Sequence, residues 1–339
     1  MTDNEAANLL ADADRLLAAG DPVAALDAAV HAHALTPSPD LAARLVVLRH
    51  TAAGTYRAPG REPWPPVHPD PFPDAPGDIP EIEPGELTGD LMAAAIEHHG
   101  SLIVRALFDP EQVARTRAAV MAATDAQPDD ADQPAPPHYL PQLGLDMLNS
   151  SLRKRVARDN GVWLADAPEA LAQVLHDLDR AGVLAAIGHH FGGRTLISLQ
   201  KSTLRRNQPQ FRHTGWHQDG SFLGTSTRAM NVWVALTPCG GDRPAPGLEV
   251  VAGRIPKLLA ADGGTGRASI EGFAVHYQAQ ATGLEVVQPS FDPGDALLFD
   301  ELMAHRTFLT HDMVQERLAL ECWFFAASHP ADKYVSLLV

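Results

Sequence analysis

The stretch GWHQDGSF at residues 215–222 contains two side chains that bind metal ions, His217 and Asp219, one residue apart. In an extended segment, side chains two positions apart point to the same face, so both can reach one ion while Gln218 points away. A second histidine, His305, follows far downstream in GDALLFDELMAHRTF. Two histidines and one carboxylate can occupy one face of an octahedral iron(II) and leave the other face open for small ligands. The pattern predicts a non-haem iron site.

The chain around these residues predicts short strands separated by glycine and proline turns. The predicted strands are Leu196–Arg205, Ala229–Thr237, Leu248–Val251, Leu284–Gln288, Ala296–Asp300 and Leu318–Phe325. A turn at Gly294-Asp295 introduces the strand that ends at Asp300, and His305 is expected in the loop beyond it. Regularly spaced strands with alternating faces favour a double-sheet jelly roll over a parallel α/β sheet. We therefore expect a mainly β fold with flanking helices.

Arg317 begins an otherwise apolar predicted strand, LALECWFF. A cation at that place is either a paired structural residue or a holder of an anion, and the metal-binding pattern favours the anion holder. The planar guanidinium can grip the far carboxylate of a keto-acid co-substrate through two charge-assisted hydrogen bonds. Glu321 lies on the same strand face as Arg317. It could meet a cationic substrate group, but we expect it to pair with an interior arginine.

Three stretches together resemble the phytanoyl-CoA dioxygenase family of iron(II)/2-oxoglutarate oxygenases: GWHQDGSF at 215–222, GDALLFDELMAHRTF at 294–308 and ERLALECWFF at 316–325. The resemblance covers roughly the last three quarters of the chain, beginning near residues 87–113. It implies a double-stranded β-helix, with iron(II) as the cofactor and 2-oxoglutarate and dioxygen as co-substrates. It also implies that His217, Asp219 and His305 hold the iron and that Arg317 holds 2-oxoglutarate.

The resemblance adds detail to this site. His311 competes with His305 as the second histidine, but Arg317 follows His305 at close to the family's spacing. Halogenating relatives carry a small residue where Asp219 stands, so the carboxylate implies that the chain is not a halogenase of that type. Hydroxylation is the expected outcome.

Four further residues are candidates for the co-substrate pocket. Gln200 and Thr203 match the part of the family that lines it from an adjacent strand, and Asn231 is a polar residue between apolar neighbours. Thr307 stands where the family commonly has serine or asparagine. Asn, Gln or Thr on a barrel wall can instead satisfy a backbone group, so a purely structural role stays open for each. Arg205, Arg206, Arg212 and His213 could meet an anionic substrate, but exposed solvated charge is the more common explanation for such a cluster.

Residues 1–55 show apolar positions at helical spacing, with breaks at Gly20-Asp21-Pro22 and around Pro37 to Pro39. This pattern predicts a helical hairpin with a third helix. The stretch LLAAGDPVAALDAAVHAHALTP resembles one tetratricopeptide unit. A single unit cannot bury its own face, so we expect it to pack on the main domain or on a second subunit, or to contact a peptide.

Prolines dominate residues 56–86, which predicts a linker or an extended arm between the helical segment and an oxygenase domain at 87–339. Trp64 and Phe72 are candidates for pinning the arm to the body. A second proline-rich stretch, 127–142, is expected to be irregular and is either a lid or a surface excursion.

The composition of the 339-residue chain narrows its partners. A formal charge of −16 makes binding to nucleic-acid backbones an unfavourable hypothesis. The chain has two cysteines, its amino terminus lacks the pattern of a signal peptide, and no apolar run approaches the length that spans a bilayer. We expect a cytoplasmic protein, since a reducing compartment suits both the low cysteine count and ferrous iron, although a bond between Cys239 and Cys322 stays open.

The favoured hypothesis is a small-molecule hydroxylase acting on a metabolite or natural-product intermediate. One alternative is a peptide or protein hydroxylase that uses the helical segment to hold its substrate. Another is a non-catalytic scaffold or sensor, against which the complete metal set argues. A cupin-like metal enzyme without a keto acid is the last, and it would have no need of Arg317.

Overall fold

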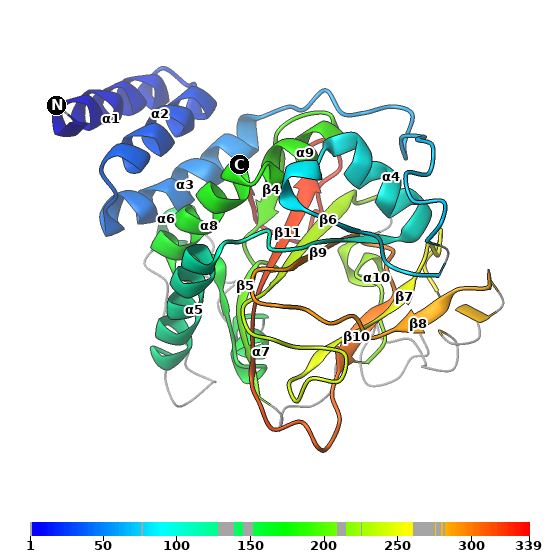
Figure 1. Ribbon diagram of the computed structural model, residues 1–339. Helices are drawn as coiled ribbons and strands as arrows, with labels where there is room; N and C mark the ends of the chain where they lie inside the picture. Colours follow the sequence, from blue (N-terminus) through cyan, green and yellow to red (C-terminus); the bar gives the residue numbers. More distant parts are fainter. Residues whose placement is uncertain are drawn as a thin grey trace.

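Two β-sheets face each other and helices cover the outer side of the larger one (Figure 1). The computed structural model describes residues 2–75, 77–127, 139–144, 152–208, 215–224, 226–259, 275, 279–280 and 282–339. The core of the predicted lid, 128–138, and the basic pair Arg212 and His213 lie outside these residues. The mainly β architecture with a helical amino-terminal segment confirms the predicted fold class.

The nine-stranded sheet has the order β1-β2-β9-β6-β11-β4-β12, with β5 joining β11 to β3. Its strands are β1 (Glu81–Ile82), β2 (Ser101–Val104), β3 (Gly161–Trp163), β4 (Thr195–Ser198), β5 (Thr203–Asn207), β6 (Ala229–Ala235), β9 (Ala296–Asp300), β11 (Arg317–Ala326) and β12 (Ser336–Leu338). The prediction of one strand over 196–205 is wrong. A turn interrupts it, in which Ser202 N–H donates to Ser198 O at 3.2 Å, and both halves pair with β11.

The three-stranded sheet has the order β10-β7-β8, formed by β10 (His305–Phe308), β7 (Gly247–Ala252) and β8 (Glu285–Val287). His305 begins a strand here, so the expectation that it lies in a loop is wrong. The strand pairs antiparallel with β7, and His305 is opposite Val250. His305 also exchanges two backbone hydrogen bonds of 3.0 Å with His217, which brings the segment before α10 to the edge of this sheet.

Alternating residues of β11 serve two separate cores. Leu320 and Phe324 belong to the apolar layer under the helices, whereas Trp323 and Phe325 belong to the layer between the two sheets. Because side chains alternate across a strand, Arg317 and Glu321 share the inner face with Trp323. Both charged side chains of β11 therefore point from the large sheet toward the space between the two sheets.

The helices follow local signals that the sequence contains. They are α1 (Thr2–Ala18), α2 (Pro22–Leu35), α3 (Pro39–Thr55), α4 (Gly89–His99), α5 (Pro110–Asp125), α6 (Leu140–Leu143), α7 (Leu152–Arg158), α8 (Pro168–Arg180), α9 (Val183–Phe191) and α10 (Gly220–Leu223). None of the helices in the described ranges is long and apolar enough to cross a membrane.

Capping residues set the boundaries of the amino-terminal helices. The Asp21 carboxylate accepts from Ala24 N–H at 3.0 Å, and the Ser38 hydroxyl accepts from Leu41 N–H at 3.3 Å, so α2 and α3 each begin after a capped proline turn. These starts confirm the predicted breaks. The third helix docks on the β-sheet body, where Arg49 Nη1 donates to Leu338 O at 2.7 Å.

The proline-rich arm lies against α4 and α9. The Trp64 ring packs 4.8 Å from the His190 ring, and the Arg228 guanidinium lies 4.5 Å from the centroid of Trp64. Phe72 meets the His99 ring edge-on at 6.0 Å. These contacts confirm that Trp64 and Phe72 pin the arm.

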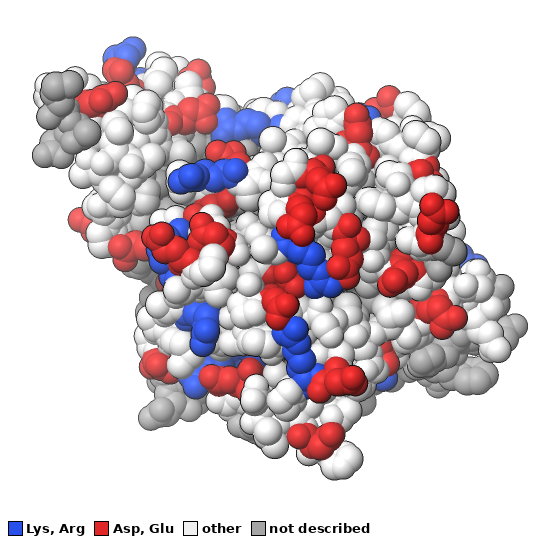
Figure 2. All heavy atoms as spheres, in the orientation of Figure 1, with Lys and Arg blue, Asp and Glu red and all other residues white. Residues whose placement is uncertain are grey.

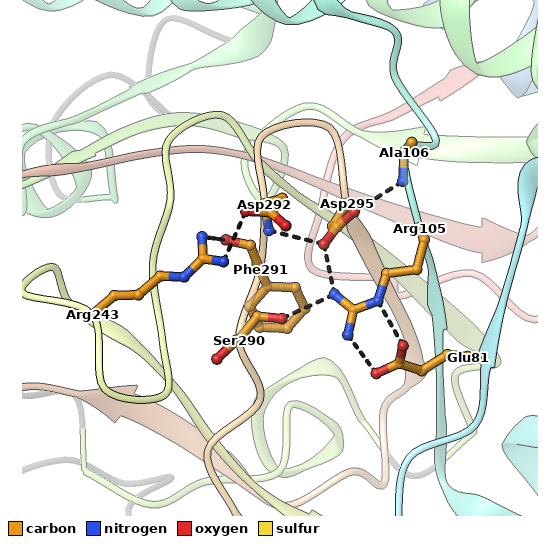
Figure 3. Close-up of polar contacts among 8 residues, drawn as sticks. All are labelled: Glu81, Arg105, Ala106, Arg243, Ser290, Phe291, Asp292 and Asp295. Atoms are coloured by element: carbon orange, nitrogen blue, oxygen red, sulfur yellow. Dashed lines mark hydrogen bonds and ion pairs between the residues drawn. The ribbon is translucent and has the colours of Figure 1, made fainter.

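A polar corner fixes the turn that leads into β9 (Figure 3). The Asp295 carboxylate accepts from Ala106 N–H at 2.9 Å, from Asp292 N–H at 2.8 Å and from Arg105 Nη1 at 2.6 Å. Gly294 has φ +101°, and a Cβ there would lie 2.2 Å from Phe108 O, so only glycine fits. The predicted turn at Gly294-Asp295 thus has a structural cause: it sets the start of the strand that leads toward His305.

Figure 2 shows acidic side chains spread over one face of the molecule and interleaved with basic ones. Several described arginines have a carboxylate neighbour: Arg115 lies 2.8 Å from Glu111, and Arg243 lies 2.7 Å from Asp292. Positive charge at these positions is locally compensated.

Candidate metal and co-substrate site

His217, Asp219 and His305 come together at the edge of the small sheet. One potential ligand atom from each lies within 4.8 Å of the others, and no other such group occurs among the described residues. The reciprocal backbone bonds between His217 and His305 place the two imidazoles side by side, with ring centroids 4.3 Å apart. Residues 88 positions apart in the sequence are thereby joined by strand pairing.

Asp219 reaches the site in a different way from the one that the spacing suggested. Asp219 has helical backbone angles, φ −63° and ψ −27°, and stands at the start of α10. His217 and Asp219 therefore do not share the face of one continuous strand. Gln218 points away, as predicted. Its amide donates to Lys257 O at 3.0 Å and to Leu302 O at 2.6 Å, and its oxygen accepts from Leu259 N–H at 2.7 Å. These bonds hold the bend that brings Asp219 back toward His217.

Backbone carbonyls orient both imidazoles. His217 Nδ1 lies 2.8 Å from Gly215 O, and His305 Nδ1 lies 3.1 Å from Met303 O. A carbonyl only accepts, so each Nδ1 donates a hydrogen bond and each Nε2 is the ring nitrogen left to face a metal. Burial, with His305 as the next cause, lowers the pKa of His217 to about 4, so this imidazole is neutral near pH 7. The donor set of two imidazoles and a carboxylate suits iron(II).

Arg317 is a buried cation with no acidic partner among the described residues. It is 4% exposed, and its Nη1 and Nη2 donate to Gly247 O at 2.9 Å and to Asn207 Oδ1 at 2.8 Å. Its Nε is buried and has no hydrogen-bond partner. Burial lowers the pKa of this guanidinium, which shows that the charge is poorly compensated. A site of this kind favours a bound carboxylate.

The strand register sets the separation between Arg317 and the metal-binding group. Gly247, which accepts from Arg317, pairs with Phe308 at the end of β10, whereas His305 begins the same strand. Three residue steps correspond to about 10 Å along the strand. A five-carbon dicarboxylate that is chelated near His305 can extend toward Arg317 over this span.

The other predicted pocket residues divide into two kinds. Asn231 lies on the inner face of β6, is 1% exposed and has an Oδ1 with no hydrogen-bond partner. Thr307 is two residues after His305 and shares its face of β10. By contrast, Thr203 donates its hydroxyl to Glu321 at 3.2 Å, and Gln200 accepts from Val335 N–H at 2.7 Å in the turn between β4 and β5.

Glu321 pairs with an interior arginine, as expected. Its Oε2 lies 3.1 and 3.0 Å from Arg205 Nε and Nη2, and Trp323 Nε1 donates to its Oε1 at 3.1 Å. Burial alone would raise the pKa of Glu321, but Arg205 and Lys201 outweigh it and hold the pKa at about 2. Arg206 instead points to Glu316, at 2.8 Å. Neither arginine is left to serve as an unpaired anion site.

Lys201 is the functional candidate that the sequence analysis missed. Its Nζ lies 3.8 Å from Asp219 Oδ1 and 4.1 Å from the centroid of the Phe222 ring. No strand pattern could have placed it there, because Lys201 lies in the turn between β4 and β5, where side chains do not alternate as they do along a strand.

The fold and this donor set define a non-haem iron oxygenase of the 2-oxoglutarate-dependent class. The phytanoyl-CoA dioxygenase model matches residues 96–310, and the chain belongs to that family. Its cofactor is iron(II), and 2-oxoglutarate is its co-substrate together with dioxygen. A comparison with curated protein sequences gives no match.

Two solved structures illustrate the likeness. The apo form of EctD from S. alaskensis is 19% identical with a TM-score of 0.48, and the alignment covers 82% of this chain and 87% of EctD. SnoK, a non-haem α-ketoglutarate-dependent carbocyclase from nogalamycin biosynthesis, is 13% identical with a TM-score of 0.49, over 76% of this chain and 99% of SnoK.

Proposed function

We propose that this oxygenase hydroxylates an unactivated C–H bond of a small-molecule metabolite or natural-product intermediate and releases succinate and carbon dioxide. The observation that carries the proposal is Arg317, a buried guanidinium without a carboxylate partner in the described part of the chain. Its acceptor Gly247 lies opposite Phe308, three residues along β10 from His305. A cupin-like enzyme without a keto acid has no use for such a residue.

Each residue then has a defined task. His217, Asp219 and His305 hold the iron through two Nε2 atoms and one carboxylate oxygen. Arg317 binds the far carboxylate of 2-oxoglutarate. Thr307 and Asn231 line the inner face between these ends, and Thr203 and Gln200 support the wall through their own bonds. When bound, iron(II) would activate dioxygen with 2-oxoglutarate as the electron donor, and this would supply the oxidant that removes hydrogen from a C–H bond.

The helical segment supports a small-molecule substrate over a peptide. In Figure 1, α1 and α2 lie at the opposite side of the molecule from α10 and β10, where the metal-binding residues reside. Apart from its packing on α2, α3 contacts β12, α8 and α6. We propose that residues 1–55 form an accessory helical unit, joined by the arm at 56–86 to the oxygenase domain at 87–339, and that the unit serves docking, for example in a homodimer.

Anaerobic titration of the ferrous protein with 2-oxoglutarate tests the proposal. Chelation of the keto acid by iron(II) produces a weak visible charge-transfer band, which should appear in the wild type and vanish in His305→Ala. His311→Ala provides the matched control, because His311 is exposed and lies outside the metal-binding group. A band that survives in His305→Ala, or no band in the metallated wild type, would overturn the assignment.

A further inference from the structure

We propose that Lys201 is a positioning residue that keeps Asp219 a single-oxygen iron ligand. The inference rests on the proposed iron-binding role of Asp219 and assigns a task to a residue outside the ligand set.

The two oxygens of Asp219 face different partners. Oδ2 lies 3.8 Å from His305 Nε2, on the side where the metal-binding atoms converge. Oδ1 lies 3.8 Å from Lys201 Nζ. Asp219 is 3% exposed, so water competes little for either oxygen. The carboxylate is therefore divided between a metal-facing oxygen and an oxygen facing a fixed positive charge.

The fold holds the Lys201 ammonium in place. Its backbone belongs to the turn between β4 and β5, where its N–H donates to the Ser198 hydroxyl at 3.3 Å. The ammonium lies over the Phe222 ring, and that ring stacks on His217 with centroids 6.2 Å apart and planes at 28°. Phe222 therefore contacts both the lysine and an imidazole of the site, and a cation over an aromatic face is attracted to it.

Asp219 is the one carboxylate within 4.0 Å of the Lys201 ammonium in the described part of the chain. Glu321, the other acidic group near it, already accepts from Arg205, Thr203 and Trp323. The positive charge is thus available to Asp219 Oδ1.

The number of coordination positions on iron(II) explains why Asp219 should bind through one oxygen only. Octahedral iron(II) offers six positions. Two imidazoles and one carboxylate oxygen leave three, which the two donor atoms of the keto acid and one small ligand require. A carboxylate bound through both oxygens would occupy one of them. An ammonium that attracts Oδ1 opposes that second bond and so preserves the open position.

The test compares Lys201→Met, which removes the charge at similar length, with Lys201→Arg, which retains it. Lys333→Met is the matched control, because Lys333 is exposed. Each protein is loaded with Co(II), and infrared difference spectra report the splitting of the carboxylate stretches, which narrows when both oxygens bind. Binding of 2-oxoglutarate to the same samples is measured by calorimetry. Circular dichroism checks folding, and Lys201→Gln replaces the Met variant if that variant does not fold.

We expect the splitting to narrow in Lys201→Met and the affinity for 2-oxoglutarate to fall by about tenfold, the size of a typical coupling between sites. Lys201→Arg and Lys333→Met should resemble the wild type. An unchanged splitting in Lys201→Met overturns the inference, even if the affinity falls, because the lysine would then act on 2-oxoglutarate directly. Failure of the wild type to bind Co(II) would instead overturn the proposed metal site.

Discussion

Arg105 and Arg317 show how differently one residue type is used in two regions of the protein. Arg105, in the corner before β9, lies between Glu81 and Asp295, and its hydrogen bond to Glu81 is the main cause that raises its pKa (Figure 3). Arg317, on the inner face of the barrel, is bound only by carbonyl and amide oxygens, and burial lowers its pKa. The first arginine is neutralised by the fold. The second has no carboxylate partner among the described residues, and its Nε has no hydrogen-bond partner.

The carboxylates of the two regions differ in the same way. Asp295 accepts two backbone N–H groups and Arg105, whereas Asp219 has an ion pair at 3.8 Å and no hydrogen bond to its side chain among the described residues. A fully bonded carboxylate stabilises a turn, and an uncommitted one is available to a metal.

Exchanging these two carboxylates for alanine should give the largest effects. Asp219→Ala is expected to lower 2-oxoglutarate turnover by more than about a hundredfold, because loss of a ligand costs more than loss of its outer support. Its melting temperature should stay close to that of the wild type. Asp295→Ala should instead lose about 3 kcal/mol of unfolding free energy and retain metal binding, since it breaks a buried network. Equal loss of stability in both variants would contradict the comparison.

Replacing Arg317 or Arg105 should give the next largest effects. Arg317→Met should weaken 2-oxoglutarate binding on the order of a hundredfold, as for loss of one partner of a desolvated charge pair. The kcat at saturating 2-oxoglutarate should change less than KM. Arg105→Met should leave KM unchanged and lower thermal stability. Steady-state kinetics and thermal melts of both variants test these expectations. An unchanged KM for 2-oxoglutarate in Arg317→Met would exclude Arg317 as the residue that binds this co-substrate.

The sequence could predict this division only in part. Residue types and the family resemblance predicted His217, Asp219, His305 and Arg317, and the structure brings the first three together. The sequence could not show that Thr203 is bonded to Glu321, since such pairing depends on the register between β5 and β11. The break between β4 and β5 was missed because the residues of that turn, Leu199–Ser202, include no glycine or proline. For the same reason Lys201 was overlooked.

Glu301 is a partly buried carboxylate near the site whose charge is not compensated, so it should make the unfolding free energy depend on pH. Burial, followed by the charge of Asp300, raises its pKa to about 8, and its Oε2 accepts from Ala229 N–H at 2.9 Å. The folded state therefore keeps a proton that the unfolded state releases above its ordinary pKa of 4.5. Stability should fall as pH rises from about 4.5 to about 8, by on the order of 5 kcal/mol.

Glu301→Gln removes this titration and keeps an acceptor for Ala229. Its unfolding free energy relative to the wild type should increase between about pH 5 and about pH 8, as measured by urea denaturation at each pH. A difference that is constant across this range would show that Glu301 is ionised in the folded protein.

The smallest effect is expected at Thr307, between the two ends of the site. It shares the face of β10 with His305, and its strand ends opposite Gly247, which binds Arg317. A hydroxyl at this place can bond the co-substrate without balancing its charge, so Thr307→Val should raise the KM for 2-oxoglutarate only about threefold to tenfold. Thr310→Val, beyond the end of the strand, is the control and should leave KM unchanged. An effect as large as that of Arg317→Met would mean that the position of the carboxylate along β10, and not its charge, governs binding.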